Sequence, residues 1–150
     1  HAAPDLDTEA LFDEPMVLVT APGDALARLR KPGWADVAAR PCVLPPPWAS
    51  LRVKLEQQFF AHELHPPADI IESASFLVQL TFMQQRGAVA FMARSVARHH
   101  AQLGMVALLD LPVRIALPPV GLITLRGQRM TPVTAALVEC LRDEARLLAQ

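Results

Sequence analysis

The sequence has no tyrosine and only two tryptophans and two cysteines among its 150 residues. Two cysteines cannot build the disulfide framework that stabilises many small secreted domains. Cys42 and Cys140 also match no spacing that is used by metal-binding cysteines. We therefore expect reduced thiols and a reducing compartment, the cytoplasm.

Long hydrophobic runs and clusters of one charge are missing as well. The longest apolar runs, residues 16–22 and 105–112, have the length of a strand, whereas a helix that crosses a bilayer needs about 20 apolar residues. The formal net charge is −1 and no basic cluster stands out, so this chain alone lacks an electrostatic surface for DNA or RNA. We expect no membrane insertion and no direct nucleic-acid binding.

Motifs of enzyme chemistry are also lacking. The sequence contains no phosphate-binding glycine loop and no Gly-x-Ser-x-Gly motif. Asp69 and Glu72 form no recognisable acid–base pair, and Cys42 has no histidine or other base within a motif. We therefore expect no catalytic residue, no cofactor, no metal ion and no enzymatic activity.

Hydrophobic residues, by contrast, make up 52% of the chain and charged residues 19%, which excludes a disordered protein. A chain of 150 residues is long enough for one domain with its own core. The sequence starts with His1-Ala2-Ala3 instead of an initiator methionine, and no signal-peptide pattern is present. We expect it to be a piece of a longer protein.

Short apolar runs closed by proline or glycine predict strands, and apolar residues spaced by three and four predict helices. The expected strands are residues 16–20, 42–44, 68–72, 88–92, 105–111 and 120–125. The expected helices are residues 34–39, 50–62, 94–102, a helix after Ser73 or Ser75 that ends at Gly87, and one that runs from Pro132, capped by Thr131, to the chain end. This alternation predicts an α/β fold with a mostly parallel sheet between helices.

The stretch PPPWASLRVKL, residues 45–55, places a rigid proline turn directly before a helix. Two interpretations fit it. Ser50 can simply cap the helix while Trp48 packs nearby. Alternatively, the turn forms a small anion site, because a helix N-terminus offers N–H groups without intrahelical partners and the positive end of the helix dipole. The residue types alone leave both interpretations open.

Four longer stretches resemble the effector-binding domain of LysR-type transcriptional regulators. EPMVLVTAPGDALA (residues 14–27) is similar to a strand and turn of that family that end in Pro-Gly-His-Pro-Leu-Ala, with Asp24-Ala25 in place of His-Pro. PCVLPPPWASLRVKLEQQFFAHEL (residues 41–64) resembles the strand, proline turn and helix. Residues 72–100 resemble a helix, a buried strand and a Pro-Arg-Ser-Val-Ala helix start, with Ala93 in place of the proline, and PVGLITLRGQRMTPVTAALVECLRDEA (residues 119–145) resembles the return strand and the C-terminal helix.

This resemblance implies the fold of type 2 periplasmic binding proteins, in which two α/β lobes joined by two crossing strands hold a small molecule between them. Residues 1–20 would then be a remnant of the first lobe and a crossover strand, residues 21–119 the second lobe, and residues 120–150 the return strand and C-terminal helix of the first lobe. Most of the first lobe and the DNA-reading winged helix-turn-helix would lie outside this chain. We further expect the 16–20 strand to have an unpaired edge and the chain to self-associate.

In the family, the turn that corresponds to PPPWAS lines the cleft and meets an anionic effector, so the resemblance favours the effector interpretation. It implies a site with members Pro47, Trp48, Ala49, Ser50, Arg52, Ser73, Ser75 and Phe91. Alternatives remain for several of them. Ser73 and Ser75 can act as caps, and apolar Phe91 is more often core than cleft lining. Arg52 needs a partner so close to a positive helix end, either an effector carboxylate or a structural Asp or Glu.

Histidines form the remaining conspicuous group. Adjacent His99 and His100 point about a third of a turn apart on a helix and rarely bind one ion, so we interpret them as a solvated helix end. His62 and His65 receive the same interpretation.

The resemblance thus implies the ligand-sensing part of a bacterial regulator that binds an organic, aromatic or sugar acid. Its expected partners are that small effector and further copies of itself in a homodimer or homotetramer. It would contact DNA only through the winged helix-turn-helix that is absent from this chain, and no membrane. The alternative hypothesis is a lobe of a periplasmic solute-binding protein.

Overall fold

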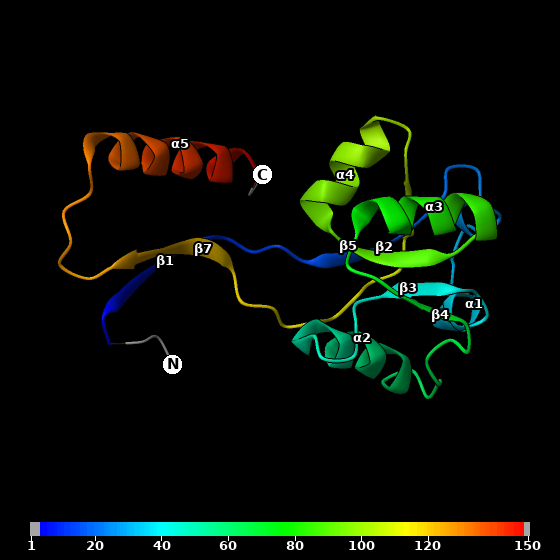
Figure 1. Cartoon of the computed structure of the whole chain (residues 1–150). Coiled ribbons are helices and arrows are strands. Elements are labelled where there is room, and N and C mark those ends of the chain that lie inside the picture. Colours follow the sequence, from blue (N-terminus) through cyan, green and yellow to red (C-terminus); the bar gives the residue numbers. More distant parts are fainter. Residues whose placement is uncertain (1–3, 149–150) are drawn as a thin grey trace. The chain divides into compact units, whose positions relative to one another are not determined.

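The computed structural model describes residues 4–148 and divides the chain into two units. The larger unit is Pro15–Ala116, and the smaller one combines residues 4–14 with residues 117–148. Figure 1 labels the helices and strands of both units and colours them by their position in the sequence. Each unit is built around its own sheet.

The larger unit contains a five-stranded sheet with the order β4-β3-β5-β2-β6. Its strands are β2 (Met16–Thr20), β3 (Cys42–Leu44), β4 (Ile70–Glu72), β5 (Val89–Ala93) and β6 (Ala107–Leu108). β3 pairs in parallel with β4 and β5, whereas β2 runs antiparallel to β5 and β6. The α/β fold is confirmed, and four of the five strands run in the same direction, as expected for a mostly parallel sheet, whereas β2 alone enters in the reverse direction.

Helices cover both faces of this sheet. They are η1 (Leu26–Arg28), α1 (Trp34–Ala38), α2 (Ser50–Phe60), α3 (Phe76–Arg86) and α4 (Arg94–Gln102). In Figure 1, α3 and α4 lie on one side of the sheet and α1 and α2 on the other. Gly87 ends α3 in the left-handed conformation, with φ +60°, as its position after the apolar pattern predicts.

The strand period of two distributes the core over these two faces. Cys42 and Leu44 of β3 belong to a cluster with Leu55 and Phe59 of α2, whereas Val43 points to the opposite cluster. β5 alternates in the same way, with Val89 and Phe91 on the first side and Ala90 and Met92 on the second. A strand buried on both faces needs apolar residues at every position, which is why the sequence reads as an unbroken apolar run.

The structure corrects three details of the strand prediction. β2 lies between β5 and β6, and because β6 pairs with Val19 and Thr20, the unpaired edge expected at residues 16–20 is confined to the first residues of the strand. The strand expected at residues 105–111 is reduced to Ala107–Leu108. A strand that was not predicted, β1 (Leu6–Phe12), reads as polar because four of its seven residues are exposed.

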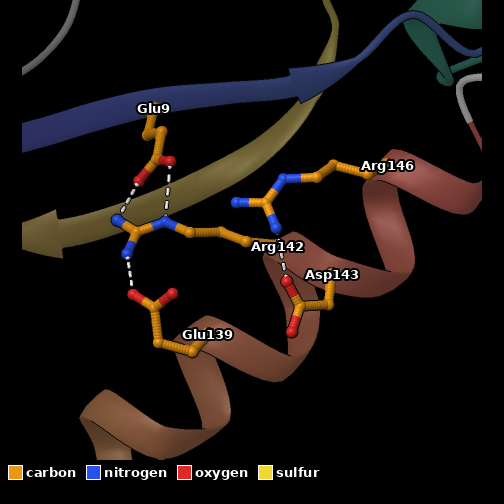
Figure 2. A network of polar contacts seen from close by, with 5 residues as sticks. All are labelled: Glu9, Glu139, Arg142, Asp143 and Arg146. Atoms are coloured by element: carbon orange, nitrogen blue, oxygen red, sulfur yellow. Dashed lines mark hydrogen bonds and ion pairs between the residues drawn. The ribbon is translucent and has the colours of Figure 1, made fainter.

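The smaller unit consists of β1, β7 (Val120–Leu125) and α5 (Pro132–Leu148). β1 and β7 form a two-stranded antiparallel ribbon. Thr131 caps α5 as predicted, accepting a hydrogen bond of 3.2 Å from the backbone N–H of Thr134. Arg142 of α5 reaches β1 and binds both carboxylate oxygens of Glu9, as Figure 2 shows.

Candidate functional site

The carboxyl edge of the five-stranded sheet is where three strand-to-helix connections converge. β3, β4 and β5 run parallel to one another, so their carboxyl ends lie at the same edge. β3 and β4 continue through turns into α2 and α3, and β5 passes directly into α4. In open α/β sheets, ligands bind outside the carboxyl ends of the strands, and this edge is therefore the candidate site.

The first of these turns, residues 45–49, connects β3 to α2 and carries a tryptophan in solvent. The side chain of Trp48 is 86% exposed, and Pro47 beside it is also exposed. The backbone N–H of Ala49 donates to the carbonyl of Pro46 at 3.0 Å, which closes the turn. An exposed indole on a proline-stiffened turn offers a flat apolar face at the sheet edge.

The predicted cap at Ser50 is wrong. Ala49 occupies the N-cap position and has no side chain that can accept a hydrogen bond, and Ser50 is the first helical residue of α2. The hydroxyl of Ser50 lies on an exposed residue at the helix start. The simpler of the two interpretations of the proline turn, plain side-chain capping, is thereby removed.

The second turn, after β4, is bonded to the first strand of the edge. The backbone N–H of Ser73 donates to the carbonyl of Leu44, the last residue of β3, at 2.9 Å. The Ser73 hydroxyl accepts the N–H of Ser75 at 3.0 Å, and Ser75 is the N-cap of α3 without a side-chain capping bond. The two serines therefore lie beside the β3–α2 turn, on the neighbouring strand.

The helix starts at the carboxyl edge have no side-chain caps. The N-caps of α2, α3 and α4 make no side-chain hydrogen bond. The N-cap of α1, Gly33, makes none either, although Asp36 accepts its N–H, whereas Thr131 caps α5. The N–H groups of a helix start are left for another acceptor where no side chain caps them.

Arg52 is buried, with 7% of its surface exposed, and the structure gives it internal partners. Its Nε donates to Glu56 at 2.7 Å, and Nη1 donates to the carbonyl of Pro45 at 2.8 Å and lies 3.4 Å from Glu72. Of the two partners considered for this arginine, a structural carboxylate is the one that is present. Arg52 thereby ties α2 to the β3–α2 turn and to the end of β4.

Phe91 lies inside the core rather than at the open edge. Its ring is 4% exposed and lies 6.3 Å from that of Trp34 and 6.4 Å from that of Phe59. The structure thus brings together seven of the eight expected site residues around two neighbouring turns, namely Pro47, Trp48, Ala49, Ser50, Arg52, Ser73 and Ser75. Phe91 belongs to the strand beneath them.

A hollow of about 390 Å³ at the same edge was not anticipated. It lies where β5 passes into α4 and where β2 begins, since Met16 pairs with Ala93. Arg94 and Asp110 supply its charged groups, and its apolar lining comes from Met16, Val17, Leu109, Leu111, Pro112 and Val113. An Arg-Ser pair directly after a buried strand was the signal that could have identified Arg94.

Two histidines stack on aromatic rings, and Cys42 lies in the core. His62 stacks on buried Trp34 with a ring separation of 5.1 Å. His100 is half-buried and stacks on Phe76 at 4.1 Å, so the expectation of a solvated pair is wrong for His100, although His99 is exposed. Burial raises the pKa of the Cys42 thiol to about 12, partly offset by the nearby Arg52 charge.

Within residues 4–148, no group of three or more histidine, cysteine, aspartate or glutamate side chains has the geometry of a metal site. The described helices include none that is long and apolar enough to cross a membrane.

Residues 1–146 match the family of the LysR substrate binding domain. The chain belongs to this family. Over 137 residues it is 27% identical to the HTH-type transcriptional regulator GbpR of Azospirillum brasilense, which covers 91% of the chain and 40% of GbpR. The chain therefore spans about two fifths of the length of this curated relative. The family membership that the four sequence stretches predict is confirmed.

Solved structures show the same fold. The effector domain of AmpR from Pseudomonas aeruginosa has a TM-score of 0.71 at 18% identity, over 99% of this chain and 69% of that one. The regulatory domain of CcmR from Synechocystis PCC6803, solved in complex with 2-PG, has a TM-score of 0.68 at 13% identity, over 95% and 68%. The expected fold of LysR regulatory domains is thereby confirmed for this LysR substrate-binding domain.

Proposed function

We propose that this LysR substrate-binding domain senses a small anionic effector at the carboxyl edge of its five-stranded sheet. The observation that carries the proposal is the 86% exposure of Trp48 on a stiff turn that leads into the uncapped start of α2. An anion accepts hydrogen bonds from the N–H groups of such a helix start, while the indole covers an apolar face of the same molecule.

The effector site consists of the β3–α2 turn with Pro47, Trp48, Ala49 and Ser50, and of Ser73 and Ser75 on the adjacent turn. Arg52 takes part through its bonds to Pro45 and Glu72, which hold the two turns together. Phe91 supports the site from the core beneath it. Organic, aromatic or sugar acids fit this set, because hydroxyls, backbone N–H groups and one exposed ring supply the contacts.

The two units correspond, in this proposal, to parts of two lobes. The larger unit contains most of the second lobe, residues 21–119, together with the crossover strand β2, and the smaller unit is the described part of the first lobe, from residues 1–20 and 120–150. The first lobe and a DNA-binding winged helix-turn-helix would be completed by sequence outside this chain. Effector binding would then shift an equilibrium between two global states of a cytoplasmic regulator.

Self-association is the second part of the proposal. The smaller unit exposes large apolar side chains on both ribbon and helix, with Ile123 68% and Val133 79% exposed. Each strand of a two-stranded ribbon also has an edge without a strand partner. We expect this chain to form dimers or larger assemblies through these surfaces. Light scattering that reports a monomer at high concentration contradicts this part.

The effector proposal is tested by fluorescence titration with a panel of carboxylic acids that includes 2-PG, the compound bound to CcmR. Trp48 reports the binding, because the other tryptophan, Trp34, is buried. We expect Trp48→Ala and Ser50→Ala to weaken binding by about tenfold, corresponding to the loss of one good contact each. Isothermal titration calorimetry measures the affinities of the variants, because a substitution of Trp48 removes the fluorescent reporter. Trp48→Phe is the matched control, since it keeps an aromatic face.

The same two variants in the full-length regulator are expected to lose the transcriptional response to the effector while operator binding stays unchanged. Effector affinity that is equal to wild type in both Trp48→Ala and Ser50→Ala would falsify the assignment of the site to this turn.

A further inference from the structure

Residues 109–116, which follow β6, belong to no helix or strand. Leu111, Val113 and Ile115 are half-buried and pack against the core cluster that contains Leu55 and Phe59 of α2. Every second residue between them is exposed. The segment therefore has the alternation of a strand, but the elements that it packs against include a helix.

The side-chain amide of Gln58 on α2 makes the two backbone hydrogen bonds with Arg114 that a neighbouring strand would otherwise make. Its Nε2 donates to the carbonyl of Arg114 at 2.8 Å, and its Oε1 accepts the backbone N–H of Arg114 at 2.8 Å. Gln58 is only 9% exposed. If this contact breaks, the Gln58 Nε2 and Oε1 and the Arg114 N–H and carbonyl all lose a hydrogen-bond partner. Unsatisfied buried polar groups are costly, so the contact has a strongly preferred geometry.

Lys54, one helical turn before Gln58, adds a third bond to the same segment. Its Nζ donates to the carbonyl of Ala116 at 2.6 Å. Ala116 is the last residue of the larger unit before the chain continues into the smaller one. Positions four apart lie on one face of a helix, so α2 holds this segment at two successive turns.

The first turn of α2 is bonded to the candidate effector site. Arg52 binds the carbonyl of Pro45, where the β3–α2 turn begins, and it also binds Glu56 on its own helix. One short helix thus has side-chain bonds to the effector turn at its start and to the departing segment at Lys54 and Gln58.

We propose that Gln58, with Lys54, is a positioning residue that couples the β3–α2 turn to residues 109–116. The inference rests on the proposed function for its ligand, but the coupling itself is a property of the fold. Anything that orders the start of α2 restrains the whole helix, and the bonds of Gln58 pass this restraint to the segment that leads to the smaller unit. A coupling of this kind requires one element that both ends bias, and α2 is that element.

The coupling is tested without a ligand by ordering the start of α2 with Ala49→Ser. This change introduces the missing side-chain cap, and a serine cap stabilises a helix by about 1 kcal/mol relative to alanine, or roughly fivefold. Amide exchange at the first turn of α2 verifies the cap, and the NMR order parameters of the Val113 and Ile115 N–H groups measure the response in the 150-residue chain. The amide of Arg114 is left out, because its partner is altered in the variants.

We expect Ala49→Ser to slow exchange at the first turn of α2 by about two- to fivefold, within the range that the cap supplies, and to raise the order parameters of Val113 and Ile115 above their wild-type values. With Gln58→Leu in addition, the first turn of α2 should still gain protection, but Val113 and Ile115 should not respond. Gln58→Glu keeps the acceptor for the Arg114 N–H and should give an intermediate response. Gln57→Leu is the matched control, an exposed glutamine on the same helix, and should respond like wild type.

Two results overturn the coupling. In the first, Ala49→Ser leaves Val113 and Ile115 unchanged although α2 gains protection. In the second, the response persists undiminished in Gln58→Leu.

A second arm separates this inference from the proposed function. 2-PG is added to the wild-type chain, and Trp48 fluorescence is recorded together with the order parameters of Val113 and Ile115. A Trp48 response without any change at these amides overturns the coupling and leaves the effector site standing. If Trp48 responds neither to 2-PG nor to the other acids of the panel, the proposed function fails, and the capping result alone decides the coupling.

Discussion

Arg142 of α5 binds Glu9 of β1 through two parallel hydrogen bonds, 2.9 Å from Nε and 2.6 Å from Nη2. The third nitrogen of the same guanidinium pairs with Glu139, one helical turn earlier (Figure 2). The two residues that are joined lie 133 positions apart in the sequence. This contact fixes α5 against the β1–β7 ribbon, together with the burial of Val138 and Ala145.

We expect Arg142→Met to lower the thermal midpoint of the smaller unit slightly, and more at low than at high salt, because the pair is exposed to solvent and therefore screened. Circular dichroism at two ionic strengths measures this. Arg142→Lys is the control that keeps the charge and loses the two-pronged contact. A loss equal at both ionic strengths would mean that the effect comes from packing.

The same pair predicts a dependence on pH. The hydrogen bond from Arg142 holds the pKa of Glu9 below its ordinary value of 4.5. A lowered folded-state pKa means that the stabilisation is present above this value and is lost as pH falls through the folded pKa. We expect wild type to lose more stability than Arg142→Met below about pH 4.5. Parallel stability curves of the two proteins in acid rule this out.

The two cysteines should differ sharply in reactivity. Cys42 is fully buried with a pKa of about 12, whereas Cys140 is exposed on α5. Because the thiolate is the reacting species, we expect iodoacetamide to modify Cys140 and to spare Cys42 until the protein unfolds. Mass spectrometry with and without urea measures both sites. Early alkylation of Cys42 in the native protein would contradict its burial.

The two tryptophans should differ in the same manner in their effect on stability. Trp34 is 5% exposed and packs edge-on against Phe59 at 5.2 Å, whereas Trp48 is 86% exposed. We expect Trp34→Ala to destabilise the protein by about 3–5 kcal/mol, and Trp48→Ala to change its stability by less than about 0.5 kcal/mol. Urea denaturation distinguishes them, and a large loss in Trp48→Ala would assign that residue a structural role.

Gly87 and Gly104 have similar left-handed backbone angles, φ +60° and +68°, but different surroundings. A Cβ at Gly87 would come within 2.5 Å of Nη2 of Arg40, whose Nε binds the Gly87 carbonyl, whereas nothing lies within 4 Å at Gly104. We expect Gly104→Ala to cost about 1 kcal/mol and Gly87→Ala clearly more. Equal losses in urea denaturation would show that Arg40 yields without cost.

Most of the local structure of the larger unit follows from the sequence. The start of α4 at Arg94, the end of α3 at Gly87 and the strand Cys42–Leu44 are found where the pattern predicts them. These positions depend on neighbouring residues, through proline, glycine and apolar spacing. The candidate site was found less completely, because Arg94 and Asp110 join it only through strand pairing.

What escaped prediction depends on partners that are distant in the sequence. β1 carries few of the apolar signals of a strand and is recognised by its register with β7, where Leu6 pairs with Leu125. The direction of β2 is likewise decided by its pairing with β5 and not by its own residues.

The sequence by itself determined the family, the α/β class and the proline turn that carries Trp48, since all three are encoded in contiguous residues. Only the tertiary structure decided that Arg52 forms ion pairs with Glu56 and Glu72 and that Gln58 is hydrogen-bonded to the backbone of Arg114. A side chain's partner depends on which backbone groups the fold leaves within reach, and a local pattern does not contain that information.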